Sequence, residues 1–175
     1  GWDADPTNPA VAAQLKKNAD ALRTGYNDAG FDYAERIYKC NPDGLDTKAL
    51  AVHNQDWVTE GALEFIDAHT NEPFFLYFAT TIPHGPRQPN RSWKGDRRIT
   101  PEGILDTPVT NVQPDAASIE ERLMRKGLEP RHYGNILWLD DAVKALMDKL
   151  RDEGIDDTTL IFFCSDHGME AKGTV

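Results

Sequence analysis

The stretch that decides the fold is residues 159–168, which read Thr-Leu-Ile-Phe-Phe-Cys-Ser-Asp-His-Gly. Its run of apolar residues, from Leu160 to Cys164, is typical of a strand that is buried on both faces. The run ends abruptly in polar residues. In open α/β sheets, ligands bind outside the carboxyl ends of the strands. We therefore expect Asp166 and His167, which follow the strand, to lie at the mouth of a site.

A second stretch with the same design lies upstream. Asn54 is a good N-cap for a helix that extends to residue 68, and an apolar strand follows at 74–79. This strand leads to Pro83-His84. The succession of helix, turn and fully apolar strand predicts an α/β fold, with a mostly parallel sheet flanked by helices. Because the carboxyl ends of parallel strands meet at one edge of the sheet, we expect His84 to lie near Asp166 and His167.

Three further helices and one further strand are expected. Apolar residues at helical spacing predict helices at 10–22, 115–126 and 130–152, whereas imperfect alternation predicts a strand at 31–38. Between them lies a long loop, residues 86–114, which contains five prolines. A loop of this length in a compact domain is usually functional or disordered. It carries five cations: Arg87, Arg91, Lys94, Arg97 and Arg98.

Composition and charge limit the possible partners. The formal net charge of −10 argues against nucleic acid, although a metal or a few local cations can still create a site for a small anion. No apolar run reaches the roughly 20 residues of a membrane-spanning helix, and the opening residues do not predict a signal peptide. The two cysteines, Cys40 and Cys164, fit neither a disulfide framework nor a zinc site, and we expect Cys164 to be a buried residue of its strand.

The polar residues after the two strands form a plausible set for metal-assisted chemistry. Asp166 and His167 offer a carboxylate and an imidazole to a divalent cation, which would act as a Lewis acid. His84 and Lys172 could donate hydrogen bonds to a bound anion. Each residue also has an ordinary explanation, as a turn residue, a helix cap or a solvated lysine. Only their joint position at one sheet edge favours a site.

These residues resemble the sulfatases of the alkaline-phosphatase superfamily. The resemblance covers residues from about 30 to 175, and its two strand-end motifs are specific in their order and spacing. The stretches that carry it are Gly30-Phe31-Asp32, the strand at 73–79 with Pro83-His84, the helix from Tyr133 with Leu139-Asp140-Asp141, the strand end Ser165-Asp166-His167-Gly168, and Lys172-Gly173-Thr174.

The resemblance implies an alkaline-phosphatase-like fold and hydrolysis of sulfate esters, of carbohydrates or of aryl alcohols. It implies that Asp166 and His167 bind one Ca²⁺ ion, that Lys172 holds the sulfate, and that His84 touches the sulfate or the leaving-group oxygen. His84 is also a candidate general acid, since imidazole titrates near neutral pH. Members of the family are expected in the periplasm or outside the cell.

The sequence departs from the family pattern in its first part. The family nucleophile is a formylglycine, which is made from Cys or Ser in a Cys/Ser-x-Pro/Ala-x-Arg motif, and no such motif is present. Cys40-Asn41-Pro42-Asp43-Gly44 is a near miss, because Gly44 stands where the arginine belongs. We therefore interpret residues 1–175 as part of a sulfatase catalytic domain, without its nucleophile-bearing portion or its C-terminal subdomain. Such a piece should be inactive alone and could self-associate through an unpaired sheet edge.

Two other interpretations remain open at this stage. A phosphodiesterase or phosphonate hydrolase of the same superfamily would share the strand end at Asp166 and His167, and imidazole prefers softer metals than calcium. Alternatively, the chain is a non-catalytic domain that binds an acidic partner through the cations of loop 86–114. In the sulfatase interpretation, Arg87 and Arg91 could instead contact a polyanionic sugar.

Overall fold

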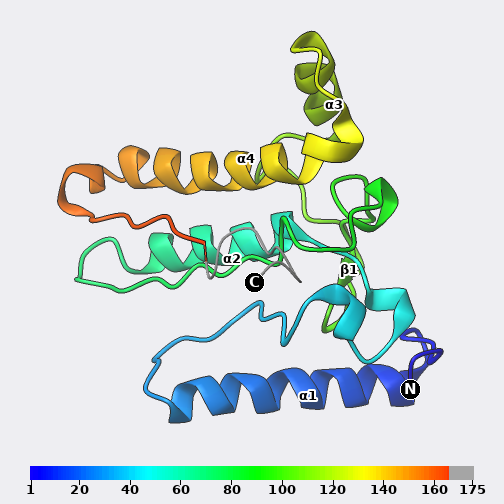
Figure 1. The fold of residues 1–175 in the computed structure, drawn as a ribbon. Coiled ribbons are helices and arrows are strands. Elements are labelled where there is room, and N and C mark those ends of the chain that lie inside the picture. Colours follow the sequence, from blue (N-terminus) through cyan, green and yellow to red (C-terminus); the bar gives the residue numbers. More distant parts are fainter. Residues whose placement is uncertain (166–175) are drawn as a thin grey trace, which may run out of the picture.

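The computed structural model describes residues 1–165, so the predictions for Asp166, His167 and Lys172 lie outside the described residues. Within this part of the chain, helices dominate and one small sheet is present (Figure 1). The helices are α1 (Pro9–Asp28), α2 (Gln55–Ala68), α3 (Ala116–Arg125) and α4 (Pro130–Asp152), with short 3₁₀ turns at Pro42–Gly44, Lys48–Leu50, Pro89–Arg91 and Asp156–Thr158. The strands are β1 (Ile99–Thr100) and β2 (Gly103–Ile104).

The predicted helices are confirmed, and local signals explain their ends. Asn54 caps α2, since its side-chain oxygen accepts a hydrogen bond from the Trp57 amide at 3.1 Å. Asp115 caps α3 in the same way. Helix α4 begins with Pro130 at its first position and is followed by Gly154 at φ 68°. Helix α1 is longer than predicted, because it continues through Gly25 to Asp28.

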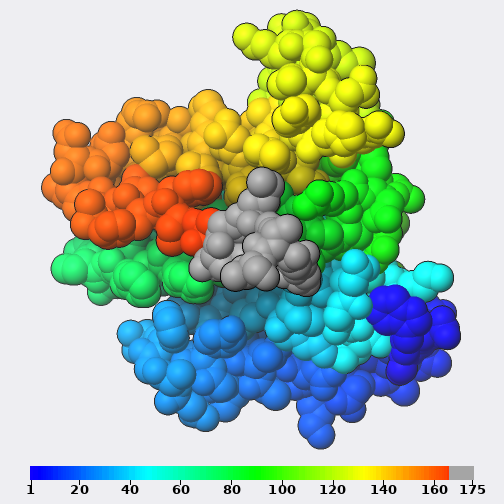
Figure 2. All heavy atoms as spheres, in the orientation of Figure 1, coloured from blue at the N-terminus to red at the C-terminus, as the bar shows by residue number. Residues whose placement is uncertain are grey.

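Helices α2 and α4 pack together, and α3 packs against α4. In Figure 1, α1 runs along the opposite side of the molecule from α4, and in Figure 2 α3 projects as a separate lobe. The main core cluster is centred on two buried indoles, Trp93 and Trp138, with Ile82, Ile119 and Leu123 around them. None of the described helices is both long enough and apolar enough to cross a bilayer.

The mostly parallel sheet is not confirmed. Segments 74–79 and 160–164 leave α2 and α4 and run in the same direction in Figure 1, as predicted, but neither pairs with another strand within residues 1–165. The sheet in this part of the chain is an antiparallel pair, in which Ile99 faces Ile104 and Thr100 faces Gly103. A segment forms a strand only beside a hydrogen-bonding neighbour, and no such neighbour is described here.

The unpaired segments leave large apolar side chains on the surface. Side chains alternate along 74–80, with Phe74 half-buried against Phe65 of α2 and Phe75 76% exposed. Phe162 is 84% exposed, and the prediction that Cys164 is buried is wrong, because its strand face is uncovered. Self-association through these segments stays a prediction. Analytical ultracentrifugation of the 175-residue chain would check it, and a clean monomer at high concentration would contradict it.

The predicted strand at 31–38 is wrong. Residues 31–38 are irregular, and Arg36 adopts a positive φ of 56°, which no continuous strand accommodates. Tertiary contacts override the alternation. The Arg36 guanidinium binds Glu60 and Glu64 of α2, and the Tyr38 hydroxyl donates to the Val52 carbonyl at 3.0 Å.

Gly134 of α4 lets the Trp93 ring lie very close to the helix backbone. A Cβ atom at this position would lie 2.6 Å from Cδ2 of Trp93, whose side chain is itself fully enclosed. We expect Gly134→Ala to lower the free energy of unfolding by about 1–3 kcal/mol through overpacking. Gly25→Ala is the matched control, because nothing lies within 4 Å of its added Cβ. The control should be neutral or slightly stabilising in urea denaturation; equal stability of the two variants would contradict the packing argument.

Candidate functional site

The loop that follows segment 74–80 presents His84 at the surface. Ile82 is buried in the main core cluster, and the Thr80 hydroxyl donates to the Ile82 carbonyl at 2.9 Å, which closes the turn. The Ile82–Pro83 and Gly85–Pro86 peptide bonds are cis and flank the histidine. The loop is therefore anchored on its inner side, and His84 lies on its exposed side.

The hydrogen bonding of His84 defines its tautomer. Nδ1 lies 3.1 Å from the Gly85 carbonyl oxygen, which can only accept, so Nδ1 must carry a proton. In the imidazolium form, Nε2 carries the second proton and can pass it to a bound ligand. This arrangement suits the general-acid role that the sequence predicts for His84.

A second histidine, which the sequence analysis missed, lies behind this loop. His53 is 1% exposed, and its Nδ1 lies 2.6 Å from the hydroxyl oxygen of Thr81. Its backbone amide donates to the Arg91 carbonyl at 3.0 Å. Within residues 1–165, Nε2 is buried and makes no hydrogen bond. The local sequence gives no sign of these contacts, except that a histidine stands in the apolar stretch before the α2 cap.

Burial lowers the pKa of the His53 imidazole from its ordinary 6.5 to about 4. The backbone carbonyls of His84, Gly85 and Pro86 act in the opposite direction and raise it, whereas the charge of His84 lowers it further. Burial dominates, because a charged imidazole loses its hydration in this position. His53 is therefore neutral in the folded protein at ordinary pH.

This shift predicts a specific pH dependence of stability. Below pH 6.5 the unfolded chain protonates His53, but the folded chain does so only near pH 4. The free energy of unfolding should thus fall by up to about 3 kcal/mol between pH 6.5 and 4 because of this group. In His53→Asn, which cannot titrate, this part of the loss should vanish. Urea denaturation of both proteins at pH 7.5, 5.5 and 4.5 measures the difference, and parallel stability curves would refute the prediction.

The other predicted site residues divide into two groups. Arg87 is exposed and has no ion pair within the described part of the chain. Asp166, His167 and Lys172 lie beyond residue 165, so their approach to His84 stays a prediction. No cluster of three His, Cys, Asp or Glu side chains that could hold a metal occurs in residues 1–165.

Loop 86–114 is packed against the body of the protein rather than extended into solvent. Trp93 and Ser92 are buried, and Ser92 hydrogen-bonds Asn135 of α4. Its cations are mostly paired: Arg91 with Asp43 at 2.7 Å, Lys94 with Glu120 at 2.5 Å, Arg97 with Asp56 at 3.0 Å and Arg98 with Asp96 at 2.7 Å. These pairs neutralise the loop, which weakens the interpretation as a binding domain for acidic partners.

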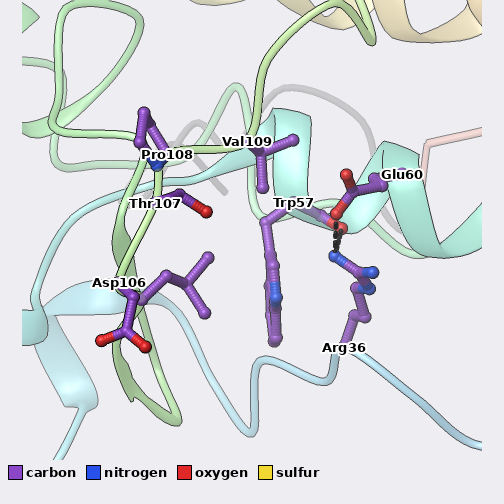
Figure 3. A pocket seen from close by; sticks show the side chains of 8 residues that line it. Arg36, Trp57, Glu60, Asp106, Thr107, Pro108 and Val109 are labelled. Atoms are coloured by element: carbon purple, nitrogen blue, oxygen red, sulfur yellow. Dashed lines mark hydrogen bonds and ion pairs between the residues drawn. The ribbon is translucent and has the colours of Figure 1, made fainter.

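The cavity in Figure 3 does not belong to the predicted site. It has a volume of about 400 Å³, and Trp57 lies between the Arg36–Glu60 ion pair and residues 106–108. Arg36 is already bound to two glutamates, at 2.5 Å and 2.8 Å, so its charge is not available to an anion. None of the predicted site residues lines this cavity.

Comparison with known proteins identifies the family. The sequence model of the Sulfatase family matches residues 12–174. The chain belongs to the sulfatase family. It is 31% identical over 110 residues to an arylsulfatase of Hemicentrotus pulcherrimus, an alignment that covers 63% of this chain and 14% of the relative. It is 30% identical over 118 residues to a choline-sulfatase of Rhizobium meliloti (strain 1021), covering 58% of this chain and 22% of the relative.

A third relative has a name that specifies an amino sugar. It is the N-acetylgalactosamine-6-O-sulfatase of Bacteroides thetaiotaomicron, which is 27% identical over 113 residues, or 65% of this chain and 16% of the relative. The chain thus spans between 14% and 22% of the length of these three relatives. All three relatives are named as sulfatases, and none of the three as a phosphodiesterase or phosphonate hydrolase.

Proposed function

We propose that these residues form part of the catalytic domain of a sulfatase, and that the full-length protein containing them hydrolyses sulfate esters. The match to the family over residues 12–174 is the observation that carries the proposal. The exposed position of His84, after the apolar segment 74–79, supports it.

The proposed roles follow from the chemistry of each side chain. Asp166 and His167 would bind Ca²⁺, with further ligands from outside this chain, since a carboxylate oxygen is a preferred calcium ligand. When bound, the ion would supply Lewis-acid stabilisation of the negative charge on the sulfate. Lys172 would hold the sulfate by charge-assisted hydrogen bonds, and His84 would protonate the leaving alcohol oxygen. The nucleophile would come from outside residues 1–175.

We propose a sulfated carbohydrate or an aryl sulfate as the substrate. The exposed guanidinium of Arg87, three residues from His84, offers a contact for a second anionic group of a glycan. If Arg87→Gln left the KM for a polysulfated glycan unchanged in the full-length protein, this contact would be abandoned.

The direct test is sulfate release by the full-length protein. It should hydrolyse 4-nitrophenyl sulfate, or a sugar from a panel of monosulfated hexosamines, and should not hydrolyse bis(4-nitrophenyl) phosphate at a comparable rate. Metal analysis should find calcium. Paired zinc or manganese, together with faster phosphodiester turnover, would instead favour the phosphate chemistry of the same superfamily.

A second test uses the 175-residue chain alone. Without a nucleophile, it should show no turnover of 4-nitrophenyl sulfate. Turnover that co-purifies with this chain would overturn the assignment of the nucleophile to another part of the protein. Cys40→Ala would then show whether Cys40, which is exposed beside Gly44, is responsible.

A further inference from the structure

His53 is a buried side chain that contacts Thr81, three residues before His84, and hydrogen bonds hold the backbone around it. Its own amide bonds the Arg91 carbonyl at 3.0 Å. The neighbouring Val52 carbonyl and Asn54 amide both bond the Tyr38 hydroxyl, at 3.0 Å and 2.9 Å. The backbone that carries the imidazole is therefore held in place by contacts that do not involve the loop of His84.

The ring of His53 links this fixed backbone to the loop through a contact with Thr81. Nδ1 lies 2.6 Å from the Thr81 hydroxyl oxygen, a short contact between two groups that are 28 residues apart in sequence. The carbonyls of residues 84–86 lie near enough to influence the imidazole electrostatically, although none accepts a hydrogen bond from Nε2. The contact that carries structural weight is therefore the one with Thr81, three residues before His84.

We propose that His53 is a positioning residue, which holds Thr81 at the start of the loop so that the His84 imidazole faces the substrate. The inference rests on the proposed function of His84. A neutral ring suits this role, because it can form one hydrogen bond with the Thr81 hydroxyl without placing a positive charge behind His84. A displacement of about 1 Å in a reacting group can cost on the order of 10²-fold in rate.

The test compares variants of the full-length protein. Thr81→Val and His53→Phe remove the hydrogen bond while largely keeping the volume, and each should lower kcat on the order of 10–100-fold with little change in KM. The double variant should be no worse than either single variant, because both remove the same contact. His53→Asn, whose amide can occupy the position of Nδ1, should recover most of kcat.

Thr59→Val is the matched control for a purely structural effect. Thr59 is more deeply buried than Thr81, and its hydroxyl donates to the Gln55 carbonyl at 2.8 Å within α2, so its loss should cost at least as much stability. This variant should lose thermal stability but keep kcat. If Thr81→Val and Thr59→Val change stability and kcat alike, or if Thr81→Val keeps the kcat of the wild type, the positioning role is refuted. If His53→Phe does not fold, Thr81→Val still decides the matter.

A readout without turnover separates this inference from the proposed function. In protein labelled with ¹³C-histidine, the ring signal of His84, assigned by its loss in His84→Gln, should shift in Thr81→Val and stay unchanged in Thr59→Val. A wild type without sulfatase activity would overturn the proposed function, but the shift would still establish that His53 and Thr81 position His84. An unmoved His84 signal in Thr81→Val overturns the positioning role, whatever the activity.

Discussion

His84→Ala in the full-length protein should lower kcat for an alkyl or sugar sulfate by about 10²–10⁴-fold, the usual contribution of a general acid. Such leaving groups depart as strongly basic alkoxides unless they receive a proton during bond cleavage. With 4-nitrophenyl sulfate, whose phenolate is a good leaving group, the same substitution should cost far less. The difference between the two substrates is the decisive measurement, since loss of sulfate binding alone would affect both equally.

Two variants test the assignment of His84 further. His84→Gln can still donate a hydrogen bond to the sulfate but cannot transfer a proton, so it should restore KM without restoring kcat for the sugar sulfate. His132→Ala is the matched control, because His132 is also exposed but lies in the first turn of α4. Its kinetics should equal those of the wild type. If His84→Ala slows both substrates by the same factor, His84 binds sulfate and is not the acid.

The helices could be predicted from the sequence because their signals are local. Asn54 caps α2 through an amide three residues away, and Gly154 ends α4 within one turn. The apolar segments 74–79 and 160–164 were also recognised, but a strand depends on a neighbour that can come from anywhere in a chain. The alternation at 31–38 failed for a related reason, since Arg36 is held by glutamates of α2.

The candidate site could be predicted only in part. His84 was predicted because it follows an apolar segment; it lies at the surface, and its approach to Asp166 and His167 stays a prediction. His53 was missed because its meaning depends on Thr81, and no spacing rule connects two residues 28 positions apart. The cations of loop 86–114 were recognised as a patch, but their acidic partners lie on other elements, such as Asp43 and Glu120. Charge patterns in a sequence reveal cations, and only tertiary structure reveals which of them are neutralised.

Arg97→Leu should lower the free energy of unfolding by about 3–5 kcal/mol, the usual cost of removing one partner of a buried ion pair. The Arg97 guanidinium binds Asp56 at 3.0 Å and lies over the Trp138 ring at 4.1 Å. It also donates to the Trp93 carbonyl at 2.9 Å, so it joins loop 86–114 to α2 and α4. Burial raises the pKa of the Asp56 carboxyl and lowers that of Arg97, and their mutual attraction offsets part of this cost.

The neighbouring arginine gives a matched control for this prediction. Arg98 pairs with Asp96 at the surface, so Arg98→Leu should unfold in urea at the same concentration as the wild type. Arg97→Leu leaves the Asp56 carboxylate buried without its ion-pair partner, although the Trp138 indole N–H still donates to it at 2.8 Å. The double variant Asp56→Leu/Arg97→Leu removes both charges and should therefore be less destabilised than the sum of the two single variants. Simple additivity would mean that Arg97 stabilises the loop through packing on Trp138 rather than through its ion pair.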